Sequence, residues 1–253
     1  MAQEADKRTL LPIASVEGWG GVRARRREEP FPDDLRDAFE EEYFECPLAY
    51  GGRYESANPH RKLTSYLREV REARGGGRLL DVGCAFGRFL EVARPYYACE
   101  GLDTSAYALE RARKKVPDVP LYHAQIEKFV TDQRYDVVTC FDVLEHVPAI
   151  DLALRGVREL LAPTGVMVAA IPVYDSLMGR AVGFIDRDPT HLHRWGRREW
   201  AQRLEANGLR VLRMKGIVRV PLPGYFLHFT SERARSWAAV ILFTCGTGDE
   251  GRA

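Results

Sequence analysis

The stretch LLDVGCAFGRFL at residues 79–90 places a short apolar run directly before small residues and a helical pattern. Small residues at a strand-to-helix turn let backbone N–H groups approach a ligand beside the positive N-terminus of the helix. The glycine spacing is Gly-x-x-x-Gly, with Ala85 where the dinucleotide fingerprint Gly-x-Gly-x-x-Gly has its second glycine, so that fingerprint is absent. Asp103 ends the next predicted strand, where a carboxylate can accept both hydroxyls of a ribose. The pattern predicts a nucleoside-type cofactor site, and the alternative is a tight turn with an acidic helix cap.

Apolar runs and helical patterns alternate along the chain around this stretch. Strands are expected at residues 78–82, 97–102, 120–123, 136–141 and 165–171, and helices at residues 86–93, 105–115 and 150–161. This alternation predicts an α/β fold with a parallel, doubly wound sheet. A helix at 197–206 is followed by strands at 209–215 and 238–244 with no clear helix between them, which predicts an antiparallel edge.

The predicted organisation is one domain behind a polar leader. Residues 1–35 carry the charge run VRARRREEPFP (22–32) and are expected to be a mobile, solvated leader. A basic RNA anchor is the alternative there, but two glutamates dilute the charge of that run. Residues 36–253 form the domain, divided into a helical cap (36–74), a core (78–172) and a lid with C-terminal strands (173–253). Two helical faces are expected in the cap: Leu35, Ala38 and Phe39 on one, and Leu63, Tyr66, Leu67 and Val70 on the other.

The composition is that of an ordinary globular protein. The 253 residues carry 37 Lys+Arg against 36 Asp+Glu, a formal charge of +1, so nucleic acid is an unlikely partner. The five cysteines form no Cys-x-x-Cys pair, and neither a zinc site nor a disulfide framework is expected. We find no secretory signal and no apolar stretch long enough to span a bilayer, so a cytoplasmic location is the expectation.

Five segments together resemble the class I S-adenosylmethionine-dependent methyltransferases. LLDVGCAFGRFL is similar to the first motif of the family and EGLDTS to the second. YHAQIEKF falls at the adenine-contacting loop, FDVLEHV follows the fourth strand, and LAPTGVMVAAIP matches the next helix-turn-strand. The resemblance covers residues 33–244 and is strongest to the small-molecule branch that includes ubiquinone-pathway and secondary-metabolism methyltransferases. It implies a Rossmann-like, seven-stranded sheet, mostly parallel with an antiparallel edge strand, and S-adenosylmethionine as cofactor, with S-adenosylhomocysteine as product.

The resemblance also implies the residues that hold the cofactor. Asp81 would lie behind the loop near the methionine amino group, and Asp103 would bind the ribose hydroxyls. Thr104, Gln125 and Ile126 would meet the adenine. The other residues implied around the methionine and ribose are Gly83, Cys84, Ala85, Gly87, Phe141 and Asp142.

Methyl transfer from a sulfonium needs alignment of donor and acceptor, and a base where the acceptor must lose a proton. His191 is the predicted base or acceptor-positioning residue, oriented by Asp188 three residues earlier, and His146 after the fourth strand is the rival. Tyr174 is a further acceptor contact. Asp142, Glu145 and His146 also match an acidic-x-x-Glu-His set that binds magnesium in some ubiquinone-type relatives, but we expect no metal here.

The predicted function is methyl transfer to a small molecule. Oxygen is the predicted acceptor atom because several histidines are expected near the opening of the site. The alternatives are an RNA or protein methyltransferase and a non-catalytic methyltransferase-like binder. The acceptor is expected under a cap from residues 33–74, 173–195 and 217–235, which are rich in aromatic residues: Phe39, Tyr43, Tyr50, Tyr54, Tyr174, Phe184, Trp195, Tyr225 and Phe226. The oligomeric state is left open.

Overall fold

The computed structural model describes residues 39–45, 54–186, 188, 190–222 and 225–247. The expected leader at 1–35 therefore lies outside the described residues, as do Leu35, Ala38 and Tyr50 from the predicted cap.

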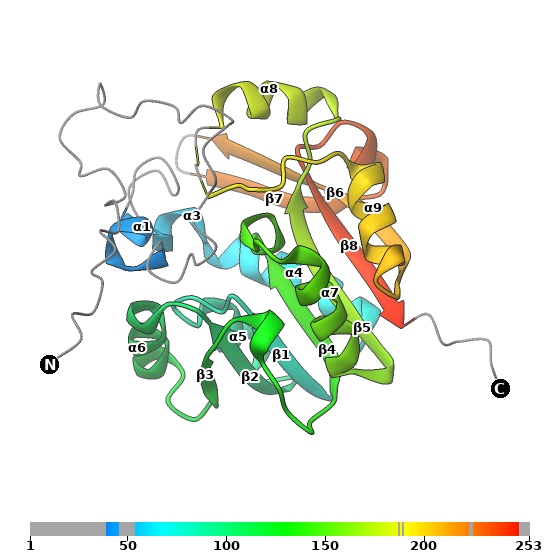
Figure 1. Cartoon of the computed structure of the whole chain (residues 1–253). Coiled ribbons are helices and arrows are strands. Elements are labelled where there is room, and N and C mark those ends of the chain that lie inside the picture. The colour runs from blue at the N-terminus through cyan, green and yellow to red at the C-terminus, as the bar shows by residue number, and fades with distance from the viewer. Residues whose placement is uncertain (1–38, 46–53, 187, 189, 223–224, 248–253) are drawn as a thin grey trace, which may run out of the picture.

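One twisted sheet of eight strands runs through the described part of the chain, in the order β3-β2-β1-β4-β5-β8-β6-β7 (Figure 1). Strands β3, β2, β1, β4 and β5 are parallel, as the predicted alternation requires. Their bounds are β1 Arg78–Val82, β2 Ala98–Asp103, β3 Leu121–His123, β4 Tyr135–Phe141 and β5 Leu161–Pro172. The mostly parallel Rossmann-like sheet expected from the sequence is confirmed.

The C-terminal strands form the antiparallel edge. Strand β8 (Val240–Thr247) lies between β5 and β6 (Leu209–Leu222) and is antiparallel to both. Strand β7 (Tyr225–Ser231) pairs with the far half of β6 in a hairpin. The described residues thus hold eight strands where seven were expected. Strand β7 was missed because prolines precede its apolar run and because its partner is a part of β6 that extends beyond the predicted strand.

Helices cover both faces of the sheet. Helices α7 (Ile150–Leu160) and α9 (Arg197–Ala206) pack on one face, and α4 (His60–Ala73) and α5 (Arg88–Ala93) pack on the other. The remaining helical elements are α1 Glu41–Glu45, α3 Tyr54–Ala57, α6 Ala106–Lys115, α8 Leu177–Ile185, and the 3₁₀ turns η2 Ile126–Lys128, η3 Leu144–His146 and η4 Arg233–Ser236. Helix α8 was not predicted, because its sequence LMGRAVGFI carries two glycines and no polar face.

Alternation along the strands divides the core between the two faces. Leu80, Val138 and Met167 point toward α7 and α9, whereas Leu79, Val137 and Val168 point toward α4 and α5. The predicted face of α4 is buried throughout, at Leu63, Tyr66, Leu67 and Val70. Because both faces are covered, the free ends of the parallel strands are left to build a site.

Candidate active site

The loop between β1 and α5 is built from small residues in left-handed backbone conformations. Gly83, Ala85 and Gly87 have φ angles of +71°, +45° and +71°, a region that residues with side chains rarely adopt. A Cβ atom on Gly83 would lie 2.3 Å from Cγ2 of Val143. Glycine is therefore required at position 83 for its backbone freedom and for lack of space.

The N–H groups of this loop are bonded inside the protein. Gly83 and Cys84 donate to the carbonyl oxygen of Leu102 at 2.7 and 3.1 Å, and Ala85 donates to Oδ2 of Asp103 at 2.7 Å. The expectation that these N–H groups approach a ligand is therefore wrong for residues 83–85, because the end of β2 already accepts them. The contribution of the loop is instead space, because its small side chains leave room for a ligand in the site.

Asp103 is held in place at the end of β2 by backbone groups. Its second oxygen, Oδ1, accepts from the N–H of Ser105 at 2.8 Å. Burial raises the pKa of Asp103, and the hydrogen bonds from Ser105 and Ala85 oppose that rise. Each carboxylate oxygen keeps a second lone pair, so this fixed side chain can still accept from two hydroxyl groups.

A cavity opens between this loop and the carboxyl ends of β2 and β4, the edge at which ligands bind in doubly wound sheets. Seven of the predicted cofactor residues line it: Gly83, Ala85, Asp103, Thr104, Gln125, Ile126 and Asp142. The structure thus brings together residues that are spread over sixty positions of the chain. The rest of the lining is mainly apolar, which suits the flat face of a nucleobase.

Asp81 lies behind the loop and does not line the cavity. It is buried, and the hydroxyl group of Thr139 on the neighbouring strand donates to Oδ1 of Asp81 at 2.6 Å. Burial raises the pKa of Asp81 to about 7, although this hydrogen bond opposes the shift. The carboxyl group therefore supports the loop from the sheet side.

Three more predicted cofactor residues lie outside the lining. Cys84 is buried, and Gly87 is the residue at which α5 begins. Phe141 turns to the α4 face of the sheet, where its ring stacks on Tyr66 with centroids 4.4 Å apart. The alternation of side chains along β4 explains this, because Phe141 falls on the same face as Val137.

Helix α1 and the residues just before it line the cavity with aromatic side chains. The sequence did not predict these side chains as part of the cofactor site. Phe39, Tyr43 and Phe44 line the cavity together with Asp103. Phe39 and Tyr43 were expected to cover the acceptor, and that role stays a prediction because the same cavity is also lined by His146. Their signal in the sequence was the i,i+4 spacing of aromatic residues, which predicts a shared face but not its partner.

Asp142 adopts a strained conformation and holds two cations. It has a φ of +56°, and its carboxylate accepts from Nζ of Lys62 at 3.0 Å and from Nη2 of Arg219 at 3.3 Å. Burial alone would raise the pKa of Asp142, but the charges of Lys62 and Arg219 outweigh it and lower the pKa. Neither cation was predicted, since they come from α4 and β6, far away in the sequence.

His146 lines the cavity and is oriented by Thr190. Its Nδ1 lies 3.1 Å from the carbonyl oxygen of Thr190 and 2.9 Å from Oγ1 of the same residue. The Thr190 hydroxyl donates its own hydrogen to Asp188 at 2.6 Å. Both Thr190 oxygens are thus acceptors toward the ring, so Nδ1 carries the proton and Nε2 is left with a lone pair. Burial, with the nearby His191, lowers the pKa of His146 to about 4.

His191 lies beside His146, with ring centroids 4.8 Å apart, but it does not line the cavity. Its Nδ1 is 2.8 Å from Oδ2 of Asp186, and Tyr174 donates its hydroxyl to the same oxygen at 2.6 Å. Burial lowers the pKa of His191, but the hydrogen bond to Asp186 and the charges of Glu145, Asp188 and Asp186 outweigh burial and raise it.

The predicted role of Asp188 in orienting His191 is corrected by these contacts. Oδ2 of Asp188 is 3.9 Å from Nε2 of His191, beyond hydrogen-bond distance. Oδ1 instead accepts from the N–H and the hydroxyl of Thr190. A carboxylate accepting from the N–H two residues later closes a local turn, and this turn makes Asp188 a support for His146 through Thr190.

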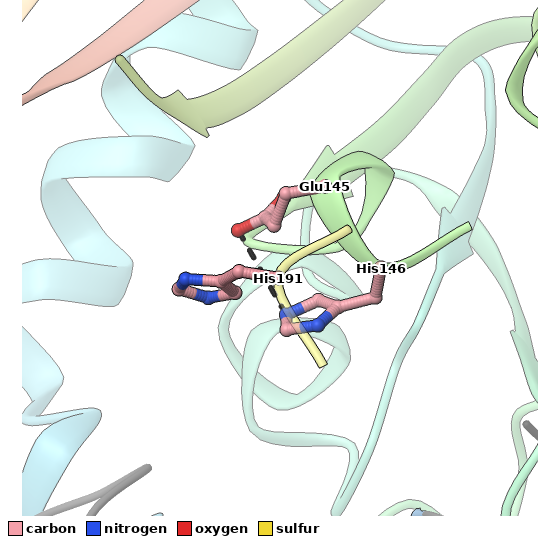
Figure 2. Close-up of side chains that lie close together, drawn as sticks. All are labelled: Glu145, His146 and His191. Carbon is pink, nitrogen blue, oxygen red and sulfur yellow. Dashed lines mark ion pairs between the residues drawn. The ribbon is translucent and has the colours of Figure 1, made fainter. Parts of the chain in front are cut away.

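Glu145 completes the group, as Figure 2 shows. Its Oε1 is 3.9 Å from Nε2 of His146, and its Oε2 is buried without a hydrogen-bond partner in the structure. Burial and the charge of Asp142 raise the pKa of Glu145 to about 8. The carbonyl oxygen of Glu145 accepts from the N–H groups of Leu192 and His193, which fastens the loop that carries His191 to η3.

Glu145, His146 and His191 are also the residues that could hold a metal ion, since one ligand atom from each lies within 4.8 Å of the others. The acidic residue expected to complete a magnesium-type set, Asp142, is occupied by Lys62 and Arg219.

The site can therefore bind a nucleoside-type cofactor and move a proton beside it. Two imidazoles in contact have pKa values shifted in opposite directions, an arrangement typical of acid–base pairs. Such a site, at the carboxyl ends of a doubly wound parallel sheet, is typical of Rossmann-like enzymes that bind a nucleoside cofactor.

Comparison with known proteins identifies the family. Residues 54–214 match the family model described as a methyltransferase domain, and the chain belongs to this family. This match confirms the S-adenosylmethionine-dependent methyltransferase family that the motifs indicated. The ubiquinone biosynthesis O-methyltransferase of Actinobacillus pleuropneumoniae is 33% identical over 113 residues, which are 40% of this chain and 48% of that protein. The dTDP-3-amino-3,6-dideoxy-alpha-D-glucopyranose N,N-dimethyltransferase of Streptomyces fradiae is 36% identical over 95 residues, which are 36% and 37% of the two chains.

The chain spans about half the length, or less, of these curated relatives. Among solved structures, the 1,6-didemethyltoxoflavin-N1-methyltransferase of Burkholderia thailandensis shares the fold with a TM-score of 0.58 at 16% identity, over 85% of this chain and 88% of that one. The N-methyltransferase NodS of Bradyrhizobium japonicum, solved with S-adenosyl-l-homocysteine, has a TM-score of 0.56 at 17% identity, over 81% and 97%.

Proposed function

We propose that this protein transfers the methyl group of S-adenosylmethionine to a hydroxyl oxygen of a small molecule. The proposal depends on one observation: a histidine that can accept a proton lies on the wall of the predicted cofactor cavity. The cavity lined by Gly83 and Asp103 is also lined by His146, whose Nε2 holds a lone pair. A nitrogen acceptor with its own lone pair would need no such group.

The residues around the cavity fit the cofactor. Asp103 is a fixed carboxylate for the ribose hydroxyls, Ile126 supplies an apolar face for the adenine, and Gly83 leaves room for the methionine end. S-adenosylmethionine supplies a methyl group made electrophilic by its sulfonium. The protein's task is then to align the acceptor oxygen, an effect worth up to about 7–11 kcal/mol in favourable cases.

Proton removal is assigned to the histidine pair. The acceptor hydroxyl gives its proton to a histidine nitrogen as its oxygen bonds to the methyl carbon, and the carbon–sulfur bond breaks to leave a neutral thioether. The sequence favoured His191 as this base. The contacts support His146, because it reaches the cavity and its proton is held on Nδ1.

The relatives support methylation of small molecules but divide on the acceptor atom, since one is named an O-methyltransferase and another an N,N-dimethyltransferase. The experiment is in two stages. Calorimetry with S-adenosylmethionine, S-adenosylhomocysteine and NAD should show binding of the first two alone. Release of S-adenosylhomocysteine is then measured with matched phenols, alcohols and amines, before and after removal of divalent metals with EDTA.

Turnover with phenols or alcohols that survives EDTA is the expected result. Turnover confined to amines would overturn the oxygen assignment. Loss of activity with EDTA and its return with a divalent cation would assign Glu145, His146 and His191 to a metal instead of a base.

A further inference from the structure

Helix α8 presents its large apolar side chains to solvent. Leu177 and Phe184 are 77% and 91% exposed, and Ala181 between them is exposed as well. These residues stand at i, i+4 and i+7, so they form one stripe along the helix. Met178 flanks the stripe. In Figure 1, α8 lies at the top of the view, above strands β6 and β7 and helix α9.

The inward side of α8 explains why its apolar residues face outward. A Cβ atom on Gly179 would lie 2.0 Å from the carbonyl oxygen of Val173, and one on Gly183 would lie 2.8 Å from the ring of Tyr174. The helix thus approaches the protein through its glycines. The hydroxyl of Ser176 caps its first turn by accepting from Gly179. The helix is therefore anchored, but Leu177, Met178 and Phe184 are not buried against its own protein.

The surface beside α8 joins an aromatic ring to positive charge. The N–H of Met178 donates to the carbonyl of Trp237 at 3.1 Å, and the indole of Trp237 is 42% exposed. Exposed arginines stand nearby in the chain, Arg180 on α8 and Arg233 and Arg235 on η4. Of the two exposed acids there, Asp175 pairs with Arg197 and Glu232 lies on the turn that begins η4. Among the residues that the structure describes, no carboxylate pairs with these arginines. Apolar side chains, a tryptophan and unpaired arginines together are typical of an interfacial membrane contact.

We propose that α8, Trp237 and these arginines form a surface that lies on an anionic lipid bilayer. No helix in the described ranges is long and apolar enough to cross a membrane, so the contact lies in the plane of the headgroups. Leu177 and Phe184 would enter the acyl boundary, and the arginines would meet lipid phosphates.

The position of α8 connects this surface to the site. The helix begins three residues after Tyr174 and ends immediately before Asp186, and Tyr174 and Asp186 are the two residues that hold His191. A bilayer beneath α8 would therefore lie next to the acceptor side. An apolar acceptor dissolved in that bilayer would have a short path to the histidines.

The test is cosedimentation of the whole protein with vesicles of phosphatidylcholine, with and without phosphatidylglycerol. Binding is expected with the mixed vesicles and is expected to weaken on pure phosphatidylcholine and in high salt. Phe184→Ser should lower the partition coefficient about tenfold or more, since a buried phenylalanine contributes on that scale. Arg233→Ser and Arg235→Ser should each cost about fivefold, on phosphatidylglycerol vesicles only. Val130→Ser is the matched control, because Val130 is 91% exposed on a loop before β4.

Equal sedimentation of wild type and Phe184→Ser would overturn the proposal. A dimer in size-exclusion chromatography that Phe184→Ser dissolves, without vesicle binding, would also overturn it and make a second copy the occupant. Calorimetry with S-adenosylhomocysteine should be unchanged in every variant. Loss of lipid binding is therefore distinguishable from failure of the proposed methyl transfer.

Discussion

Nδ1 of His191 lies 2.8 Å from Oδ2 of Asp186, and the ring held by this contact lies beside that of His146. A carboxylate at this distance favours the protonated imidazole. Asp186→Asn should therefore lower the pKa of His191, measured by NMR titration of the histidine ring protons. Asp175→Asn, which breaks an exposed pair with Arg197, is the control and should leave that pKa in place. An unchanged pKa in Asp186→Asn would show that another group sets it.

His146→Ala is expected to lower turnover by about 10²–10⁴-fold, the usual contribution of a general base, with donor affinity nearly unchanged. The comparison is His191→Ala, assayed at saturating donor. A collapse in His191→Ala with near-normal turnover in His146→Ala would return the base to the residue favoured by the sequence. Full activity in both variants would mean that the acceptor needs no base.

Asp103→Ala should weaken binding of S-adenosylmethionine by about 2–3 kcal/mol, because two charge-assisted hydrogen bonds to the ribose are lost. Calorimetry measures this change, and circular dichroism confirms the fold, since Asp103 also accepts from Ala85 and Ser105. Asp118→Ala, on the exposed turn after α6, should bind as wild type does. A folded Asp103→Ala protein with wild-type affinity would refute the ribose assignment.

The buried Glu145 should make stability depend on pH. Its pKa is about 8 in the folded protein against an ordinary value of 4.5. Between these values the folded state keeps a proton that the unfolded chain has released, so stability falls as pH rises from about 4.5 toward 8. The slope from this group is at most about 1.4 kcal/mol per pH unit. Urea unfolding across this range should show a flatter curve for Glu145→Gln, whereas exposed Glu159→Gln should follow wild type.

Gly83→Val should destabilise the loop and block cofactor binding together. The new side chain meets Val143 and the backbone stays at a positive φ, a strain of about 1–3 kcal/mol before the steric clash is counted. Thermal unfolding and calorimetry measure the two effects. Gly75→Val is the control, because a Cβ at Gly75 has no neighbour nearer than 4.0 Å.

The cofactor side of the site was predictable because its residues follow consecutive strands. The ends of neighbouring parallel strands meet at one edge, so Gly83, Asp103 and Asp142 had to converge once the alternation was recognised. The prediction of Asp188 as the partner of His191 used short spacing alone. It was wrong because a turn closed by the N–H of Thr190 redirects the carboxylate.

The two cations at Asp142 could not be predicted from spacing. Lys62 and Arg219 reach Asp142 from positions 80 and 77 residues away, and only the complete packing of α4 and β6 brings them together. Charged residues on a helix or strand usually face solvent. No local pattern in the sequence therefore predicts that Lys62 and Arg219 lie at the end of β4.

Strand β8 follows β6 and β7 in the sequence but lies between β5 and β6 in the sheet. The hairpin of β6 and β7 has no edge of the parallel sheet to join until β8 has paired with β5. During synthesis, Arg219 therefore cannot be brought to Asp142 until the final residues of β8 have left the ribosome. The cofactor half of the protein is complete in sequence long before that point. Assembly order thus makes the contact of Arg219 with Asp142 one of the last in the site to form.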